Sequence, residues 1–180
     1  DLFAAKGVQA TFFCLGWIAE RHPELVRRIV ADGHELASHG YGHLRASEQT
    51  PEDFLEDVYR AKALLEDLGG QRVLGYRAPS FSIGYSNPWA FDMLLEAGYR
   101  YSSSVYPVQH DHYGMPDSPR FAYRVGNGLI EVPVTTLRLM NRNFPSSGGG
   151  WFRLLPYAVS RWMLRNVNQQ EREPAIFYFH

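Results

Sequence analysis

The stretch that decides the fold is Gly33–His43, GHELASHGYGH, in which a short apolar-alternating run ends in two histidines four positions apart. The run predicts a buried strand over residues 34–38, and the glycines beside His39 predict a tight turn after it. Neutral imidazole is the commonest protein ligand for zinc and similar divalent ions. His39 and His43 can therefore meet at one ion, although such a pair also occurs as a structural or surface feature. Two ligands do not make a metal site, so other parts of the chain would have to complete it.

Strand and helix patterns alternate along the chain from its first residues. Residues 8–15 form a β-rich apolar run, and the helix after it is divided by Pro23. A second helix begins at Thr50 and Pro51, which have the types expected at an N-cap and a first helical position. Further strands are expected over 73–76, 99–102, 123–125, 129–133 and 175–180, and further helices over 88–98 and 156–168. This alternation implies parallel βα units.

Polar groups follow four of the predicted strands. His39, Arg77, Ser104 and His180 each lie at or just after the end of a different strand. In α/β barrels and open α/β sheets, ligands bind at the carboxyl ends of the strands. We therefore expect one domain over residues 1–180, with an α/β barrel as the first choice of fold and a doubly wound sheet as the second.

Length and composition exclude several classes of protein. A chain of 180 residues can bury a core of its own, and its net charge of −1 gives no reason to expect a nucleic-acid partner. No window offers about 18 uninterrupted apolar residues, so no membrane span is expected. Cys14 is the single cysteine, which excludes an internal disulfide and leaves the compartment, cytoplasm or cell envelope, open.

Both ends of the sequence have the pattern of a chain that continues. Residues 1–7 have the pattern of the last turns of a helix, with Gly7 stopping it, and no signal sequence precedes them. The run over 175–180 is a strand pattern without a closing element after it. We expect truncation at both ends, with the first strand of the barrel upstream of Asp1.

The motifs, in this order, resemble the polysaccharide deacetylase family, which is carbohydrate esterase family 4 or the NodB homology domain. Ser38–His43 is similar to the family's metal-binding histidine motif, and Arg77–Ser80 is similar to its Arg-x-Pro-Tyr motif. Ser102–Tyr106 resembles Asp-x-Ser-x-Trp, and Tyr178–His180 resembles Leu-x-His. Gly149–Tyr157 looks most like the deacetylases of exosortase and exopolysaccharide loci. The resemblance spans nearly the whole chain and implies an irregular (β/α) barrel of the NodB-homology type.

Three departures from the family pattern matter for the chemistry. The family's Asp-Asp pair, which supplies the catalytic base and a third metal ligand, is absent and would lie upstream of Asp1. Ser80 stands where the family has Tyr, which alters the floor of the site. Ser102 stands where the family has Asp, which removes a carboxylate that helps to hold the arginine of the third motif.

The resemblance implies a role for each candidate site residue. His39 and His43 would bind a divalent metal ion, for which zinc is the expected element. His180 would protonate the departing amine as the general acid, and Arg77 would orient the missing base by a charge-assisted hydrogen bond. The other candidates are the backbone N–H of Ser80 as an oxyanion donor, and Ser104, Tyr106 and Trp151 as substrate contacts.

The implied function is metal-dependent hydrolysis of N-acetyl groups on an exopolysaccharide or a related N-acetylated polysaccharide, by direct attack of water. Two other functions stay open, namely hydrolysis of a small non-carbohydrate amide and non-catalytic carbohydrate binding. His34 falls on the opposite face of its strand from His39, which favours a structural role. The triplet over residues 110–112, HDH, is kept only as a possible substrate contact.

Overall fold

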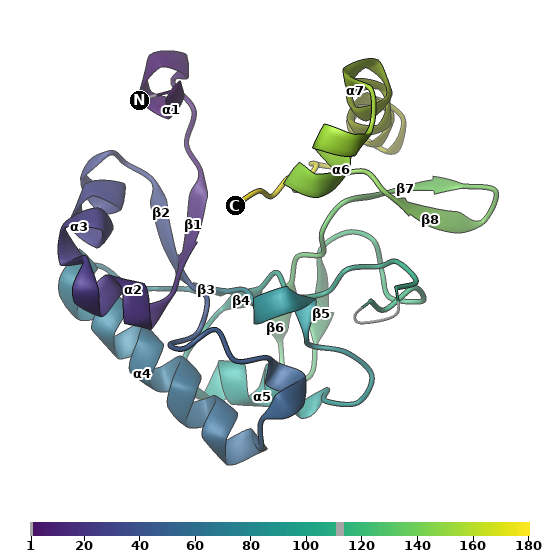
Figure 1. Cartoon of the computed structure of the whole chain (residues 1–180). Coiled ribbons are helices and arrows are strands. Elements are labelled where there is room, and N and C mark those ends of the chain that lie inside the picture. Colours follow the sequence, from purple (N-terminus) through teal and green to yellow (C-terminus); the bar gives the residue numbers. More distant parts are fainter. Residues whose placement is uncertain (1, 111–113) are drawn as a thin grey trace.

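Six strands form one sheet in the order β1-β2-β3-β4-β6-β5 in the computed structural model, which describes residues 2–110 and 114–180 (Figure 1). Neighbouring strands from β1 to β6 are parallel, and β5 pairs antiparallel with β6. A second sheet is the antiparallel hairpin of β7 and β8. The strands are β1 (Thr11–Cys14), β2 (Glu35–Ser38), β3 (Gly75–Tyr76), β4 (Tyr101–Ser102), β5 (Tyr123–Val125), β6 (Leu129–Glu131), β7 (Thr136–Leu139) and β8 (Arg142–Pro145).

Helices α2 to α5 separate the strands from β1 to β4, whereas α1 precedes β1 and α6 and α7 follow β8. The helices are α1 (Leu2–Lys6), α2 (Gly16–Arg21), α3 (Pro23–Ala31), α4 (Pro51–Gly69), α5 (Trp89–Glu96), α6 (Gly149–Leu154) and α7 (Tyr157–Asn166). Single 3₁₀ turns occupy Ala46–Glu48 and Pro79–Phe81, and a π turn occupies Val167–Glu171. The longest helix, α4, begins where Thr50 accepts a hydrogen bond from the N–H of Asp53 (3.2 Å), and it ends at the left-handed Gly70.

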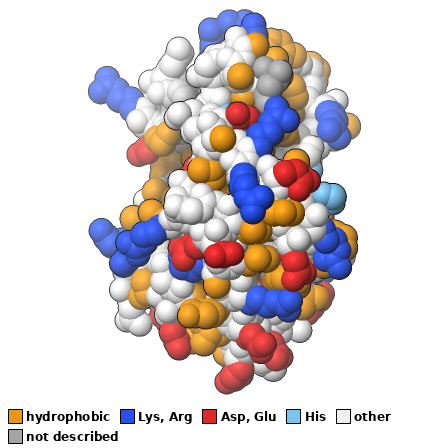
Figure 2. All heavy atoms as spheres, turned by 90° about the vertical axis from the view of Figure 1, so that its left-hand side faces the viewer, with side chains coloured by type: hydrophobic (Ala, Val, Ile, Leu, Met, Phe, Trp, Pro, Cys, Tyr) orange, Lys and Arg blue, Asp and Glu red, His pale blue; other side chains and the backbone are white. Residues whose placement is uncertain are grey.

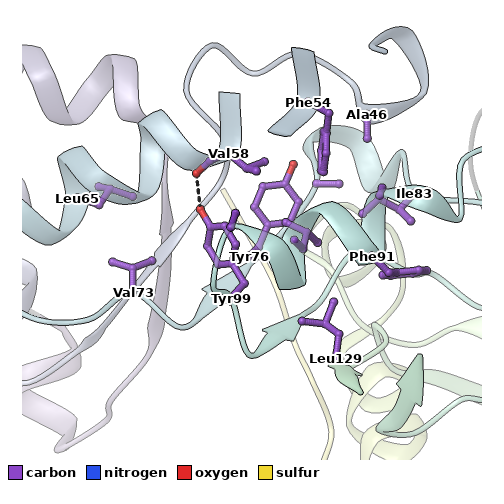
Figure 3. Close-up of a cluster of buried hydrophobic side chains, with 14 of the residues drawn as sticks. Ala46, Phe54, Val58, Leu65, Val73, Tyr76, Ile83, Phe91, Tyr99 and Leu129 are labelled. Carbon is purple, nitrogen blue, oxygen red and sulfur yellow. Dashed lines mark hydrogen bonds between the residues drawn. The ribbon is translucent and has the colours of Figure 1, made fainter. Parts of the chain in front are cut away.

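The main core lies between the sheet and the helices on one of its faces. Helices α3 and α4 pack against β2, and α5 packs against β6. Figure 3 shows this core, where the ring of Tyr76 lies beside Phe54 and the hydroxyl of Tyr99 donates to the carbonyl of Val58 (2.9 Å). Burying these aromatic side chains fixes α4 against the strands.

The side of the molecule drawn at the left in Figure 1 carries charges of both signs. Figure 2 shows basic and acidic side chains scattered over this face, with hydrophobic side chains between them. The view agrees with the near-zero net charge of the chain. None of the helices in the part of the chain that the structure describes is long and apolar enough to cross a membrane.

The α/β class with a parallel sheet is confirmed. Pro23 begins α3 directly after α2, as its position predicts. The sheet is open in the described residues, because it runs from β1 at one edge to β5 at the other without closing into a ring.

One expectation about the second half of the chain was wrong, and one element there was missed. Residues 175–180 form no strand, and the segment is held near Thr135, whose Oγ1 accepts the N–H of Ile176 (2.6 Å). The hairpin of β7 and β8 was not predicted at all. The polar triplet over 110–112 falls largely outside the described residues.

Candidate active site

The two-histidine turn is anchored to the strands that precede it. The N–H of His39 donates to the carbonyl of Cys14 at the end of β1 (2.8 Å), and the N–H of Gly16 donates to the carbonyl of Gly40 (2.9 Å). These bonds hold the turn against the start of α2. The ring centroids of His39 and His43 lie 5.2 Å apart, with the rings nearly perpendicular. The turn therefore brings the two imidazoles together at one strand end.

His39 has its tautomer fixed by a backbone group. Its Nδ1 lies 2.6 Å from the carbonyl oxygen of Arg77, and since a carbonyl can only accept, Nδ1 carries the proton. The lone pair is therefore on Nε2. Burial, followed by the nearby charges of His43, Arg77 and His180, lowers the pKa of His39 to about 4, so the ring is neutral at pH 7. A neutral imidazole whose second nitrogen is held by a carbonyl is the form that binds metal ions in proteins.

Asp57 on α4 holds the two-histidine turn through hydrogen bonds to its backbone. Its carboxylate accepts the N–H groups of Tyr41 (3.0 Å) and Gly42 (3.4 Å). Gly40 has φ +77°, and a Cβ at that position would lie 2.7 Å from Asp57 Oδ2, so the close approach requires glycine. The sequence prediction missed Asp57. The pattern that could have pointed to Asp57 is its spacing, because an acid three residues after the buried Phe54 lies on the buried side of the helix.

His180 lines the same cavity as the two histidines of the turn. This cavity has a volume of about 370 Å³, and its other walls are mostly apolar side chains from β1, α2 and α3. Although the segment over 175–180 is not a strand, the packing of Tyr178 and Phe179 against Gly148 and Gly149 carries His180 to the cavity. His39, His43 and His180 thus come together from two segments that are far apart in the sequence.

The donor set of the cavity agrees with a metal ion that needs further ligands. His39 offers the lone pair of Nε2, and the ring of His43 lies beside it, nearly perpendicular, with the centroids 5.2 Å apart. Among residues 2–110 and 114–180, no group of three or more His, Cys, Asp or Glu side chains is placed to hold an ion. The two imidazoles therefore fit part of the coordination of a divalent metal ion, which would need further ligands.

Arg77 is held by the segment after β4. Its Nε donates to the carbonyl of Ser103 (2.9 Å), and its Nη2 donates to Ser103 Oγ (2.7 Å). The guanidinium lies 4.3 Å from the ring centroid of Phe13. Burial lowers the pKa of Arg77 to about 10, which leaves the side chain cationic at pH 7. Arg77 therefore presents a fixed positive charge beside Phe13 and Ser103.

Two predicted substrate contacts are buried instead. Ser104 is fully buried, and its Oγ accepts the N–H of Ala78 (2.9 Å). Tyr106 is 1% exposed, and its hydroxyl donates to the carbonyl of Ser147 (3.2 Å). Both side chains satisfy internal hydrogen bonds, so this geometry does not support them as substrate contacts, and that role stays a prediction.

The remaining candidates lie at the surface or near it. Ser80 is exposed in the 3₁₀ turn after Arg77 and has φ 56°, a left-handed conformation that is uncommon for a residue with a Cβ. Trp151 is half-buried on α6. His34 lies away from the cavity, with its ring between Phe3 (5.6 Å) and Phe12 (5.1 Å), as expected for a structural histidine.

Comparisons with known proteins divide the chain at the end of β4. Residues 1–102 match the family described as Polysaccharide deacetylase, and residues 103–180 match a family described as Domain of unknown function (DUF3473). The deacetylase match includes the two-histidine turn and Arg77, and the second match includes His180.

Individual relatives match mainly the first part. A peptidoglycan-N-acetylglucosamine deacetylase of Bacillus cereus is 34% identical over 100 residues, which are 56% of this chain and 45% of that protein. A chitooligosaccharide deacetylase of Bradyrhizobium sp. is 31% identical over 94 residues, or 52% of this chain and 41% of its own length. A solved structure from Mycobacterium smegmatis, assigned as a polysaccharide deacetylase, has a TM-score of 0.69 at 26% identity, over 99% of this chain and 60% of that one. The chain spans less than half the length of these two curated relatives.

Proposed function

The chain belongs to the polysaccharide deacetylase family, and on this premise we propose that it is the part of a hydrolase that removes N-acetyl groups from a glycan with the help of a divalent metal ion. The single observation that carries the proposal is the meeting of His39, His43 and His180 at one cavity, with the lone pair of His39 on Nε2. The match of residues 103–180 to DUF3473 supports an exopolysaccharide as the substrate.

The metal would be held by His39 and His43, with zinc as the element we expect. Such an ion supplies Lewis acidity to the amide carbonyl. The neutral state of His39 follows from its burial, and its orientation follows from the carbonyl of Arg77. Asp57 would not bind the metal itself. It would support the site by holding the turn that carries both imidazole rings. In this proposal the site still needs a third metal ligand and a base, the groups that an Asp-Asp pair supplies in the family.

The reaction adds water across the C–N bond of the acetamido group and releases acetate and the sugar amine. His180 would give the proton that the departing nitrogen takes up. Arg77 would hold the catalytic carboxylate by a charge-assisted hydrogen bond, for which its guanidinium is already fixed by Ser103. The N–H of Ser80 would stabilise the developing oxyanion, and Trp151 would contact a sugar ring.

The test uses the protein as its gene encodes it. We expect zinc-loaded protein to release acetate from partly N-acetylated oligosaccharides, and H39A and H43A to lose both bound zinc and activity. H22A is the matched control, because His22 also borders the cavity but is not proposed as a ligand, and it should keep its zinc. Release of no acetate from any N-acetyl glycan by protein with bound zinc would refute the proposal. Hydrolysis of a small cyclic amide alone would move the function to non-carbohydrate amides.

A further inference from the structure

A buried carboxylate lies behind Arg77 on the neighbouring strands. Glu131 is the last residue of β6, its Cα partner in β4 is Ser102, and its side chain is fully buried. Oε1 accepts the N–H groups of Ser104 (2.9 Å) and Val105 (2.8 Å). Full burial of an acid is rare unless its charge is compensated, so this side chain needs a physical reason to be there.

The second oxygen of this carboxylate has no hydrogen-bond partner. Among the described residues, Glu131 Oε2 is one of two buried side-chain atoms without one. Burial raises the pKa of Glu131, and the N–H groups of Val105 and Ser104, the neighbouring Ser102 hydroxyl and, least of these, the charge of Arg77 act in the opposite direction. Glu131 in turn opposes the lowering of the pKa of Arg77 by burial. The charges of Glu131 and Arg77 therefore favour each other.

The same carboxylate also shapes the segment that holds Arg77. The N–H groups that bind Oε1 belong to residues 104 and 105, directly after Ser103. Ser103 is the residue whose carbonyl and hydroxyl accept from the guanidinium of Arg77. Ser104 in turn accepts the N–H of Ala78, which leads into the turn of Ser80. The Glu131 side chain thus holds the segment that carries the carbonyl and hydroxyl of Ser103, to which Arg77 donates. Through Ser104 it also helps to hold the backbone that follows Arg77.

We propose that Glu131 is a positioning residue of this site, which holds residues 103–105 in place and supplies the counter-charge of Arg77. The inference rests on the proposed function, because it assigns Arg77 to the reaction. A residue with this role affects the orientation of Arg77 more than the stability of the fold. Loss of its charge should therefore lower kcat while KM and bound metal stay the same.

The experiment removes the charge and then moves it to the neighbouring strand. E131Q keeps the shape and an oxygen for the two N–H groups, and we expect kcat to fall about tenfold. The exchange S102E/E131S returns a carboxylate to the same buried space, and S102Q/E131S returns the same volume without charge. We expect the first exchange to regain kcat to within threefold of wild type and the second to stay as low as E131Q.

A control and a second measurement keep the inference separate from the proposed function. E35Q removes a carboxyl that binds Thr11 and Tyr101 at the opposite end of the sheet, and its kcat should stay within twofold of wild type. Urea unfolding needs no substrate. In the R77M background the buried carboxylate has lost its counter-charge, so E131Q should raise the unfolding midpoint there and not in the wild-type background.

Failure of the proposed function and failure of the inference about Glu131 give different experimental results. A wild type that hydrolyses no N-acetyl glycan refutes the proposed function, and the urea measurements then decide the role of Glu131 on their own. Wild-type kcat in E131Q, equal kcat in the two exchanges, or the same change of midpoint in both backgrounds overturns the inference.

Discussion

Replacing Asp57 tests whether α4 holds the histidine turn. D57A removes the acceptor of two N–H groups. The N–H of Tyr41, at 3.0 Å in a half-buried position, loses its partner, which costs about 1–3 kcal/mol of unfolding free energy. The N–H of Gly42 is exposed and binds at 3.4 Å, so water can replace the carboxylate there. We therefore expect D57A to lose about 1–3 kcal/mol in all.

D57N should cost much less than D57A. It keeps one amide oxygen for the N–H of Tyr41. Burial also raises the pKa of Asp57 above its ordinary value, so the folded protein gains little from the negative charge that D57N removes. We expect D57N to lose less than about 1 kcal/mol.

Urea unfolding at pH 7 measures these differences, and bound zinc reports on the turn itself. E56A is the matched control, because Glu56 is an exposed acid next to Asp57 on the same helix, and its midpoint should not change. We expect D57A, but not E56A, to bind zinc more weakly, since the turn that carries both histidines has lost its support. Equal unfolding midpoints and zinc affinities for D57A and E56A would refute this account of the turn.

The raised pKa of Asp57 also fixes the sign of a pH effect. As the pH falls through that pKa, the folded wild type takes up a proton before the unfolded chain does, so it gains stability relative to D57N. The gain is complete below the pKa of an unfolded aspartate, about 3.9. A wild type that instead loses stability relative to D57N in this range would contradict the direction of the shift.

Substitutions at two positions and one chemical modification test other features of the fold. G40A should lose about 2 kcal/mol or more, because an L side chain is disfavoured at φ +77° and its Cβ meets Asp57; an unchanged urea midpoint would contradict this. T50A should cost about 1 kcal/mol in the same assay through loss of the cap that binds the N–H of Asp53, and T50S, which keeps the hydroxyl, should cost less. Cys14 should react with iodoacetamide at pH 8 roughly 100-fold more slowly than a free cysteine, since burial raises its pKa to about 11; alkylation at the rate of a free cysteine would refute the burial of this thiol.

Sequence patterns predicted the parallel half of the fold well. Helix α4 begins after the N-cap Thr50, with Pro51 as its first residue, and it ends before the left-handed Gly70. Local signals at both ends therefore predict its length. The strand over 35–38 and the turn after it follow from apolar alternation and glycine spacing in the same way. The positions of His39 and Arg77 after β2 and β3 follow from this topology, whereas His180 reaches the cavity from a segment that is not a strand, and the roles of all three stay predictions.

The hairpin of β7 and β8 could not be found from its sequence. Its tight turn places Met140 at φ 47° and Asn141 at φ 62°, the left-handed conformation that two-residue hairpins need. Asn-Gly or Asp-Gly is the usual signal for such a turn, and Met-Asn is not. The rest of the fold imposes the conformation here, against the preference of Met140.

Glu131 was missed because an acid in a short strand is expected to face solvent. In β6 the apolar Ile130 is 37% exposed and the acid after it is fully buried. Alternation places Glu131 on the same face as the buried Leu129, but the general preference of acids for solvent predicts exposure. Only the tertiary arrangement, with Arg77 and the N–H groups of residues 104 and 105 around the carboxyl, explains an acid at this position.

The hydrogen bond from His39 to the carbonyl of Arg77 has a consequence for how mutants of this site are interpreted. The acceptor is a main-chain atom, and every amino acid carries it. R77A or R77M therefore deletes the guanidinium while the imidazole of His39 keeps its partner and its protonated nitrogen. Position 77 serves two functions that genetics can separate cleanly, because side-chain substitution reaches one of them and leaves the other untouched.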